Sequence, residues 1–130
     1  MGLRRSTKQR RLVLEAVKKR CDHPSADDIY LDVRAVDSKI GRATVYSNLH
    51  ILAGEGEIAY VRVPGADRYD TRTELHYHLF CLGCHAVRDV EVPYRTELDR
   101  EVSAATGYML SRHRTVFEGY CPECRRQLEE

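Results

Sequence analysis

The sequence contains no apolar run long enough to cross a membrane and no N-terminal signal peptide. These absences argue against a membrane protein and predict a cytoplasmic protein, whose thiols stay reduced. Net charge is also almost absent, because 21 Lys and Arg are balanced by 20 Asp and Glu. Cysteine is scarce: outside two Cys-x-x-Cys pairs the chain has only Cys21, which is expected to be a half-buried thiol.

The two pairs are Cys81 with Cys84 and Cys121 with Cys124. Four thiolates in two such pairs are the ligands that a structural, tetrahedral zinc site requires. The 36 residues between the pairs exceed the usual zinc-ribbon interval, so the ion would join elements that are distant in sequence. A redox dithiol and two disulfides are the alternatives, and the cytosolic character of the chain favours zinc.

Charge is unevenly distributed along the 130 residues. Residues 1–20 hold eight Lys and Arg against one Glu, a net charge of +7, whereas residues 21–130 carry a net charge of −6. Such a basic segment indicates contact with nucleic acid, although a solvated helix face is the alternative. The asymmetry favours two small domains over one, residues 1–71 and residues 72–130.

Apolar residues recur at helical spacing three times in the first domain. The first helix has its apolar stripe at 12–17, the second begins near Pro24, and the third runs from about Arg42 to Ala53 with Gly54 as its stop signal. The segments 57–63 and 68–70 then read as two strands around a turn. Three short helices followed by a hairpin predict a winged helix-turn-helix.

The outward face of the third helix carries a guanidinium, hydroxyl groups, an aromatic ring and an imidazole. These groups contact base edges and phosphates in a major groove, whereas an ordinary amphipathic surface would more often show Glu and Lys. The predicted DNA contacts, with the basic first helix and the wing included, are Arg10, Arg11, Arg42, Thr44, Tyr46, Ser47, His50 and Arg62.

Residues 75–80 alternate, and a strand there places His76 and His78 on one face. Two imidazoles so spaced can chelate a metal, although two unrelated surface histidines are the alternative. Asp70 and Asp89 lie nearby in sequence. A mixed set of imidazoles and carboxylates suits Fe(II), Mn(II) or Zn(II), so the chain is predicted to hold two metals with different roles.

The remainder of the second domain predicts a small α/β body. A strand extends over 89–92, a helix has its apolar stripe at Leu98, Val102 and Ala105, and 108–120 reads as one long strand. A domain of this size seldom has a sufficient core, so a metal or a partner subunit is needed. The expected fold class is α+β, with an N-terminal winged helix-turn-helix and a small α/β dimerisation domain.

Four segments together resemble the ferric uptake regulator family of metal-dependent transcriptional repressors. They are His23 to Tyr30 (HPSADDIY), Ala43 to Tyr46 (ATVY), His76 to Cys84 (HYHLFCLGC) and Cys121 to Cys124 (CPEC). The resemblance implies a cytoplasmic homodimer that binds inverted repeats in double-stranded promoter DNA. It places a regulatory Fe2+ or Mn2+ ion on His23, Asp70, His76, His78 and Asp89, and structural zinc (Zn2+) on the four paired cysteines.

Within the family the chain is most similar to the peroxide-sensing repressors. These have Asp at the position of Asp89, where iron-uptake regulators usually have Glu. Leu75 and Tyr77 replace the His and Asp of an additional metal site, which leaves His113 without those partners. In the similar peroxide repressors the histidines matching His23 and His76 are oxidised. The alternative is an iron- or manganese-responsive repressor that ignores peroxide.

Enzyme functions fit poorly. A zinc deaminase needs His-x-Glu beside Pro-Cys-x-x-Cys, and the chain contains no His-x-Glu. A thiol oxidoreductase that used Cys121 and Cys124 would leave the other cysteine pair and the basic segment unexplained. The chain is therefore predicted not to be an enzyme.

Overall fold

A computed structural model of the protein describes the backbone of residues 2–129 and the side chains of residues 7–129. The chain divides into two compact units, Met1–Thr73 and Glu74–Glu130, two residues beyond the boundary predicted from the sequence. The side chains of Arg4 and Arg5, which contribute to the predicted basic segment, lie outside the described residues.

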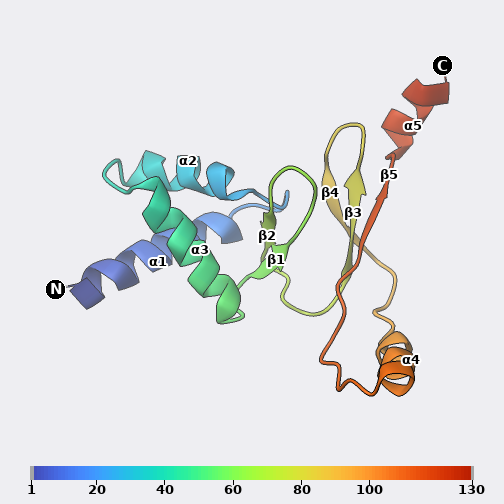
Figure 1. Ribbon diagram of the computed structural model, residues 1–130. Coiled ribbons are helices and arrows are strands. Elements are labelled where there is room, and N and C mark those ends of the chain that lie inside the picture. Colours follow the sequence, from blue (N-terminus) through green and yellow to red (C-terminus); the bar gives the residue numbers. More distant parts are fainter. Residues whose placement is uncertain (1, 130) are drawn as a thin grey trace. The chain divides into compact units, whose positions relative to one another are not determined.

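The first unit contains three helices that pack against one another: α1 (Gly2–Lys18), α2 (Ala26–Val36) and α3 (Arg42–Gly54) (Figure 1). Each helix turns one apolar stripe inward, and full burial of a large aliphatic side chain stabilises a fold by about 1.5–3 kcal/mol. The side chains that are almost completely buried are Val13, Val17, Ile29, Val33, Val45, Leu49, Leu52 and Ile58. This core holds α3 against the other two helices.

The start of α2 differs from the prediction, which placed Pro24 in its first turn. Ser25 is the N-cap, and its side chain accepts a hydrogen bond from the amide of Asp28 at 3.2 Å while Asp28 accepts the amide of Ser25 at 3.0 Å. This reciprocal capping box satisfies amides that a Pro24 start would leave unpaired. The Pro24 carbonyl instead accepts the amide of Tyr69 at 2.9 Å, which ties the helix entrance to the hairpin.

The hairpin consists of the antiparallel strands β1 (Ala59–Val61) and β2 (Arg68–Asp70), with Tyr60 opposite Tyr69. Strand β1 is shorter than the strand predicted over 57–63. Its turn includes Gly65 in the left-handed region, with φ of 93°, which a residue with a Cβ adopts only at a cost. Three helices followed by this hairpin form a winged helix-turn-helix unit.

The second unit is built on a three-stranded sheet in which β3 (Tyr77–Cys81) is central (Figure 1). It pairs antiparallel with β4 (Val87–Val90) and parallel with β5 (Val116–Gly119). The predicted strand over 108–120 is therefore wrong for most of its length. The reason is that β5 pairs only with β3, so the pairing is limited by the five residues of β3.

Two helices complete the second unit, α4 (Thr96–Thr106) and α5 (Pro122–Glu129), of which α5 was not predicted. The helix α4 ends at Gly107, a left-handed C-cap. The predicted apolar stripe of α4 is partly exposed in the single chain: Leu98 is 44% and Val102 is 40% exposed. Among the described residues, none of the helices combines the length and the apolar character needed to cross a lipid bilayer.

Candidate metal centres and nucleic-acid interface

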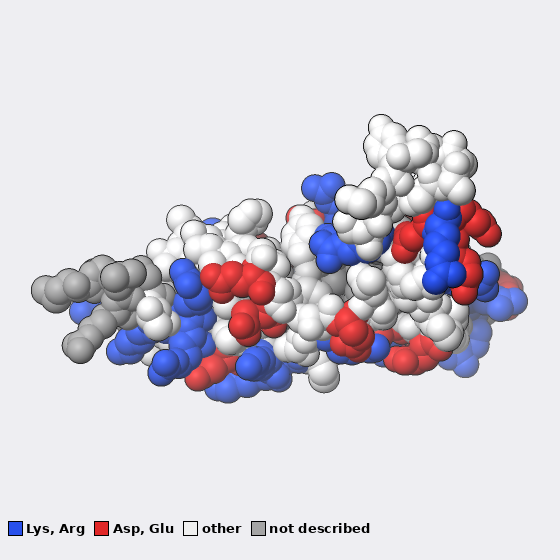
Figure 2. Space-filling view, turned by 90° about the horizontal axis from the view of Figure 1, so that it is seen from below, with Lys and Arg blue, Asp and Glu red and all other residues white. Residues whose placement is uncertain are grey.

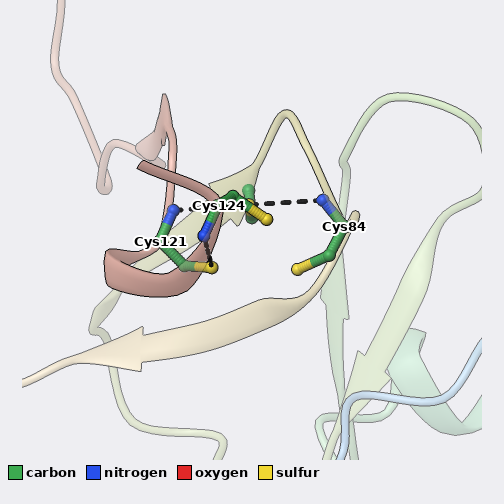
Figure 3. Close-up of side chains that lie close together, drawn as sticks. Cys84, Cys121 and Cys124 are labelled. Atoms are coloured by element: carbon green, nitrogen blue, oxygen red, sulfur yellow. Dashed lines mark hydrogen bonds between the residues drawn. The ribbon is translucent and has the colours of Figure 1, made fainter. Parts of the chain in front are cut away.

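The four paired cysteines meet in the second unit. Cys81 ends β3, and Cys84 lies in the turn that follows. Cys121 immediately precedes α5 and Cys124 lies in its first turn; Figure 3 shows Cys84, Cys121 and Cys124 close together. Their four sulfur atoms all lie within 4.8 Å of one another. Four thiolates around zinc, with Zn–S bonds of about 2.3 Å, stand about 3.8 Å apart, so the cluster fits a tetrahedral zinc ion.

Backbone amides surround the sulfur of Cys81. The amides of Cys84 and Cys121 each donate to it at 3.4 Å, and they lower the pKa of this thiol to about 5. The opposite holds for Cys124, whose pKa is raised to about 12 by hydrogen bonding to the sulfurs of Cys121 and Cys81. Cys81 thus deprotonates readily, whereas the neighbouring sulfurs disfavour deprotonation of Cys124. A divalent cation removes this effect, because thiols that coordinate a metal are deprotonated.

Gly83 allows the two cysteine pairs to approach each other. A Cβ added at Gly83 would lie 2.8 Å from the sulfur and 3.0 Å from the Cβ of Cys124. The first distance is shorter than real Cβ contacts and the second is at their short limit, so a side chain at this position would force Cys124 to shift. The absence of a side chain at Gly83 therefore leaves room for the sulfur atoms of the two pairs to surround one ion.

The predicted regulatory ligands occur in both units, and each unit carries part of the set. In the first unit, Nε2 of His23 lies 3.3 Å from Oδ2 of Asp70, and both side chains are at least nine-tenths buried. His23 has a positive φ of 54°, an uncommon conformation for a residue other than glycine. A buried imidazole held against a carboxylate in this way suits metal binding.

In the second unit, one carboxylate contacts two imidazoles. Oδ1 of Asp89 lies 2.9 Å from Nε2 of His76 and 3.3 Å from Nε2 of His78. The register explains this arrangement, because His78 is directly opposite Asp89 in the antiparallel pair of β3 and β4. The two histidine rings lie 4.4 Å apart on one side of the strand, as the alternating sequence predicted. Three donors that converge from β4, β3 and the residue before β3 fit a metal better than two unrelated surface histidines.

The predicted DNA-contact side chains lie in the first unit. Figure 2 shows the Lys and Arg side chains on one face of the molecule, with acidic groups among them. Exposed members of the set are Arg11, Arg42, Tyr46, Ser47, His50 and Arg62, and Thr44 is half-buried. Arg10 is partly engaged within the protein, since its Nε donates to Oδ1 of Asn48 at 3.4 Å. Asn48 itself, buried on α3, carried no signal in the sequence.

Comparison with known proteins agrees with this architecture. The model of the ferric uptake regulator family matches residues 1–118. The chain belongs to the ferric uptake regulator family. The peroxide operon regulator of Bacillus subtilis is 33% identical over 124 residues, which cover 95% of this chain and 86% of that protein.

Solved structures of the family have the same fold. The Helicobacter pylori ferric uptake regulator Fur, whose structure reveals three functional metal binding sites, superposes with a TM-score of 0.76 at 26% identity over 91% of this chain and 80% of that chain. The Campylobacter jejuni peroxide stress regulator gives a TM-score of 0.74 at 25% identity over 92% of this chain and 91% of that chain. The donor sets described above fit the metals of this ferric uptake regulator fold: structural zinc and a regulatory iron or manganese ion.

The sequence did not reveal the interactions of His113, which was left without the metal-site partners of the iron-uptake regulators. In the structure, Nδ1 of His113 lies 2.7 Å from Oδ1 of Asp99 on α4, and the ring stacks on Tyr94 at 4.4 Å. The Tyr94 hydroxyl accepts the amide of His113 and donates to Asp99. Hydrogen bonds from Tyr94 and His113 hold the pKa of Asp99 below its ordinary value. His113 therefore belongs to a hydrogen-bonded network of protein groups.

Proposed function

We propose that this family member represses transcription by binding promoter DNA as a metal-loaded homodimer in the cytoplasm, and that hydrogen peroxide releases it from DNA. The observation that carries the peroxide assignment is the contact of Asp89 with both His76 and His78. Aspartate at this position is the feature that the peroxide-sensing repressors share. The 33% identity to the peroxide operon regulator of Bacillus subtilis supports the same assignment.

The proposed regulatory site contains five ligands drawn from both units. They are His23, Asp70, His76, His78 and Asp89. Three neutral imidazoles and two carboxylates balance a 2+ charge and suit Fe(II) or Mn(II). Bound Fe(II) would supply the electron that reduces peroxide, and the oxidant would form beside the ligand histidines.

In this proposal, the placement of the metal ligands explains why the loss of one of them releases the protein from DNA. His23 precedes the capped start of α2, and Asp70 ends β2, so both are attached to the core that positions α3. His78 and Asp89 belong to the sheet of the second unit, and His76 immediately precedes its strand β3. A ligand set divided in this way makes the hold on the DNA-binding unit depend on every imidazole. Oxidation of His23 or His76 would remove one donor and weaken that hold.

Dimer formation is proposed for the second unit. Leu98 and Val102 lie on one face of α4 and are both exposed in the single chain, although helical periodicity marks them as a buried stripe. Phe117 on β5 is similarly 47% exposed. Covering these side chains with a second copy would bury apolar surface that the small unit cannot bury by itself.

A DNA-binding experiment tests the proposal. A duplex is first selected from random sequence with Mn(II)-loaded protein, and its binding is followed by fluorescence anisotropy with Fe(II) or Mn(II), without oxygen and then with peroxide. We expect both metals to support binding and peroxide to release only the Fe(II) protein. Retention of DNA by the Fe(II) protein would instead favour the iron- or manganese-responsive repressor. A metal-free sample with chelator is the control.

A further inference from the structure

The reading face of α3 is tied to α2 by one acidic residue. A single oxygen of Asp27, Oδ1, accepts hydrogen bonds from Nη1 of Arg42 and from the hydroxyl of Tyr46. Arg42 and Tyr46 stand four positions apart, so they occupy the same face of α3, one turn from each other. Both are among the predicted DNA contacts. The polar ends of two of these side chains are therefore already engaged in the protein without DNA.

The guanidinium of Arg42 is held from a second side. Its central carbon lies 4.5 Å from the centroid of the Tyr30 ring, which also belongs to α2. This distance is typical of a cation–π contact. Asp27 lies in the first turn of α2, where the helix dipole favours a negative charge. The contact with Asp27 thus offsets the positive charge of Arg42.

The contact is nonetheless accessible to a competing anion. The side chain of Arg42 is 56% exposed and that of Asp27 is 63% exposed. Exposed ion pairs contribute little stability, because water and salt screen them. A phosphate that approaches α3 can compete with Asp27 for Arg42. Arg42 is the only Lys or Arg within α3. The contact with Asp27 therefore determines whether the helix offers a cation to a DNA phosphate.

We propose that Asp27 determines how strongly the chain discriminates its operator from other DNA. In this proposal, which rests on the proposed DNA-binding function, Asp27 holds Arg42 off phosphates and keeps Tyr46 in position for bases. On unrelated DNA, Arg42 remains paired and adds nothing to sequence-independent binding. On the operator, the contacts made by Tyr46 and its neighbours bring the phosphate close enough to replace Asp27.

Asp27→Asn tests the proposal, because it keeps the shape of the side chain and removes its charge. The salt dependence of binding by the Mn(II) protein is measured on the selected duplex and on a scrambled duplex of equal length. On scrambled DNA, release of Arg42 should steepen the slope of log K against log [salt] by about 0.9, the value for one additional phosphate contact. The ratio of operator to scrambled affinity should fall, and Asp27→Glu, which keeps the charge, should preserve the wild-type slope.

Two controls separate this effect from a general change of charge. Glu57→Gln removes an equal charge from an exposed position between α3 and β1, and it should leave the slope unchanged. In an Arg42→Gln background, Asp27→Asn should no longer steepen the slope, because the cation that it releases is absent. Circular dichroism and thermal unfolding verify that each variant is folded.

The results distinguish failure of this inference from failure of the proposed function. If the wild-type protein selects no DNA sequence, the proposed function is wrong. If it selects an operator but Asp27→Asn has the wild-type slope on scrambled DNA, or steepens it equally without Arg42, then Asp27 has no role in discrimination.

Discussion

The hydroxyl of Tyr77 lies 2.8 Å from Nε2 of His113, across 36 positions of sequence. The same hydroxyl accepts the amide of Arg95 at 3.0 Å, and the other nitrogen of His113 contacts Asp99. Both ring nitrogens of His113 thus have protein partners. At a place where similar iron-uptake regulators carry an additional metal site, this chain has a network that connects β3, α4 and the segment before β5.

The first prediction is that His113 binds no metal. His113→Ala should leave the metal content unchanged at two ions per protomer, measured by elemental analysis of the dialysed protein. It should lower the free energy of unfolding by about 1–3 kcal/mol, because Asp99 and Tyr77 lose a half-buried hydrogen-bond partner. Urea unfolding measures this loss, and Tyr77→Phe should reproduce part of it. A third ion that disappears with His113→Ala would contradict the prediction.

The second prediction concerns pH. Tyr94→Phe removes the largest of the hydrogen bonds that lower the pKa of Asp99, so that pKa should rise towards 3.8. A carboxyl group whose pKa is depressed by folding stabilises the fold above its unfolded pKa and loses this effect as pH falls through the folded value. The stability difference between wild type and Tyr94→Phe should therefore shrink below about pH 4. Carbon-13 NMR titration of the Asp99 carboxyl group reports the pKa directly.

The third prediction concerns the cysteine cluster. Cys84→Ser removes one of four thiolates from a site whose metal contributes on the order of 10 kcal/mol to folding. Zinc, cooperative unfolding and the dimer should all be lost, as measured by elemental analysis, calorimetry and sedimentation. Cys21→Ser is the matched control: Cys21 is exposed, contrary to the half-buried thiol expected from the sequence, and lies outside the cluster. A Cys84→Ser protein that remained a stable, zinc-free dimer would refute the assignment.

The fourth prediction separates base reading from phosphate contact. Tyr46→Ala should weaken binding to the selected operator far more than binding to scrambled DNA, because Tyr46 lies on the outward face of α3. Arg11→Ala should weaken both and reduce the salt slope by about 0.9 for one phosphate contact. Equal losses on the two duplexes for Tyr46→Ala would mean that α3 does not read the sequence.

The fifth prediction concerns oxidation. After exposure of the Fe(II) protein to low peroxide, mass spectrometry should find one added oxygen atom on a tryptic peptide that contains His23 or His76. The Mn(II) protein should remain unmodified. Asp89→Glu lengthens one ligand arm, and we expect it to retain metal-dependent DNA binding while losing most of the oxidation. Equal oxidation of Asp89→Glu and wild type would show that this carboxylate does not set peroxide sensitivity.

Much of the architecture follows from local sequence patterns. Apolar spacing predicted a helix from about Arg42 to Ala53, and α3 spans Arg42–Gly54. The alternation around His76 and His78 predicted that both imidazoles lie on one side of a strand, and their rings lie 4.4 Å apart. The two Cys-x-x-Cys pairs predicted one cluster of four sulfurs, which the fold assembles. These features are readable because helix periodicity, strand alternation and short ligand spacings depend on neighbouring residues.

The sequence by itself therefore determined most of the element types, the fold class and the family, although it did not indicate α5. Only the tertiary structure decided which distant residues meet: Tyr77 with His113, Asp27 with Arg42 and Tyr46, and Gly83 with Cys124. It also limited the long strand predicted over 108–120 to Val116–Gly119, the part that pairs with β3. The physical reason is that local periodicity specifies which face of an element is apolar, whereas the packing of whole elements selects the partners of its polar groups.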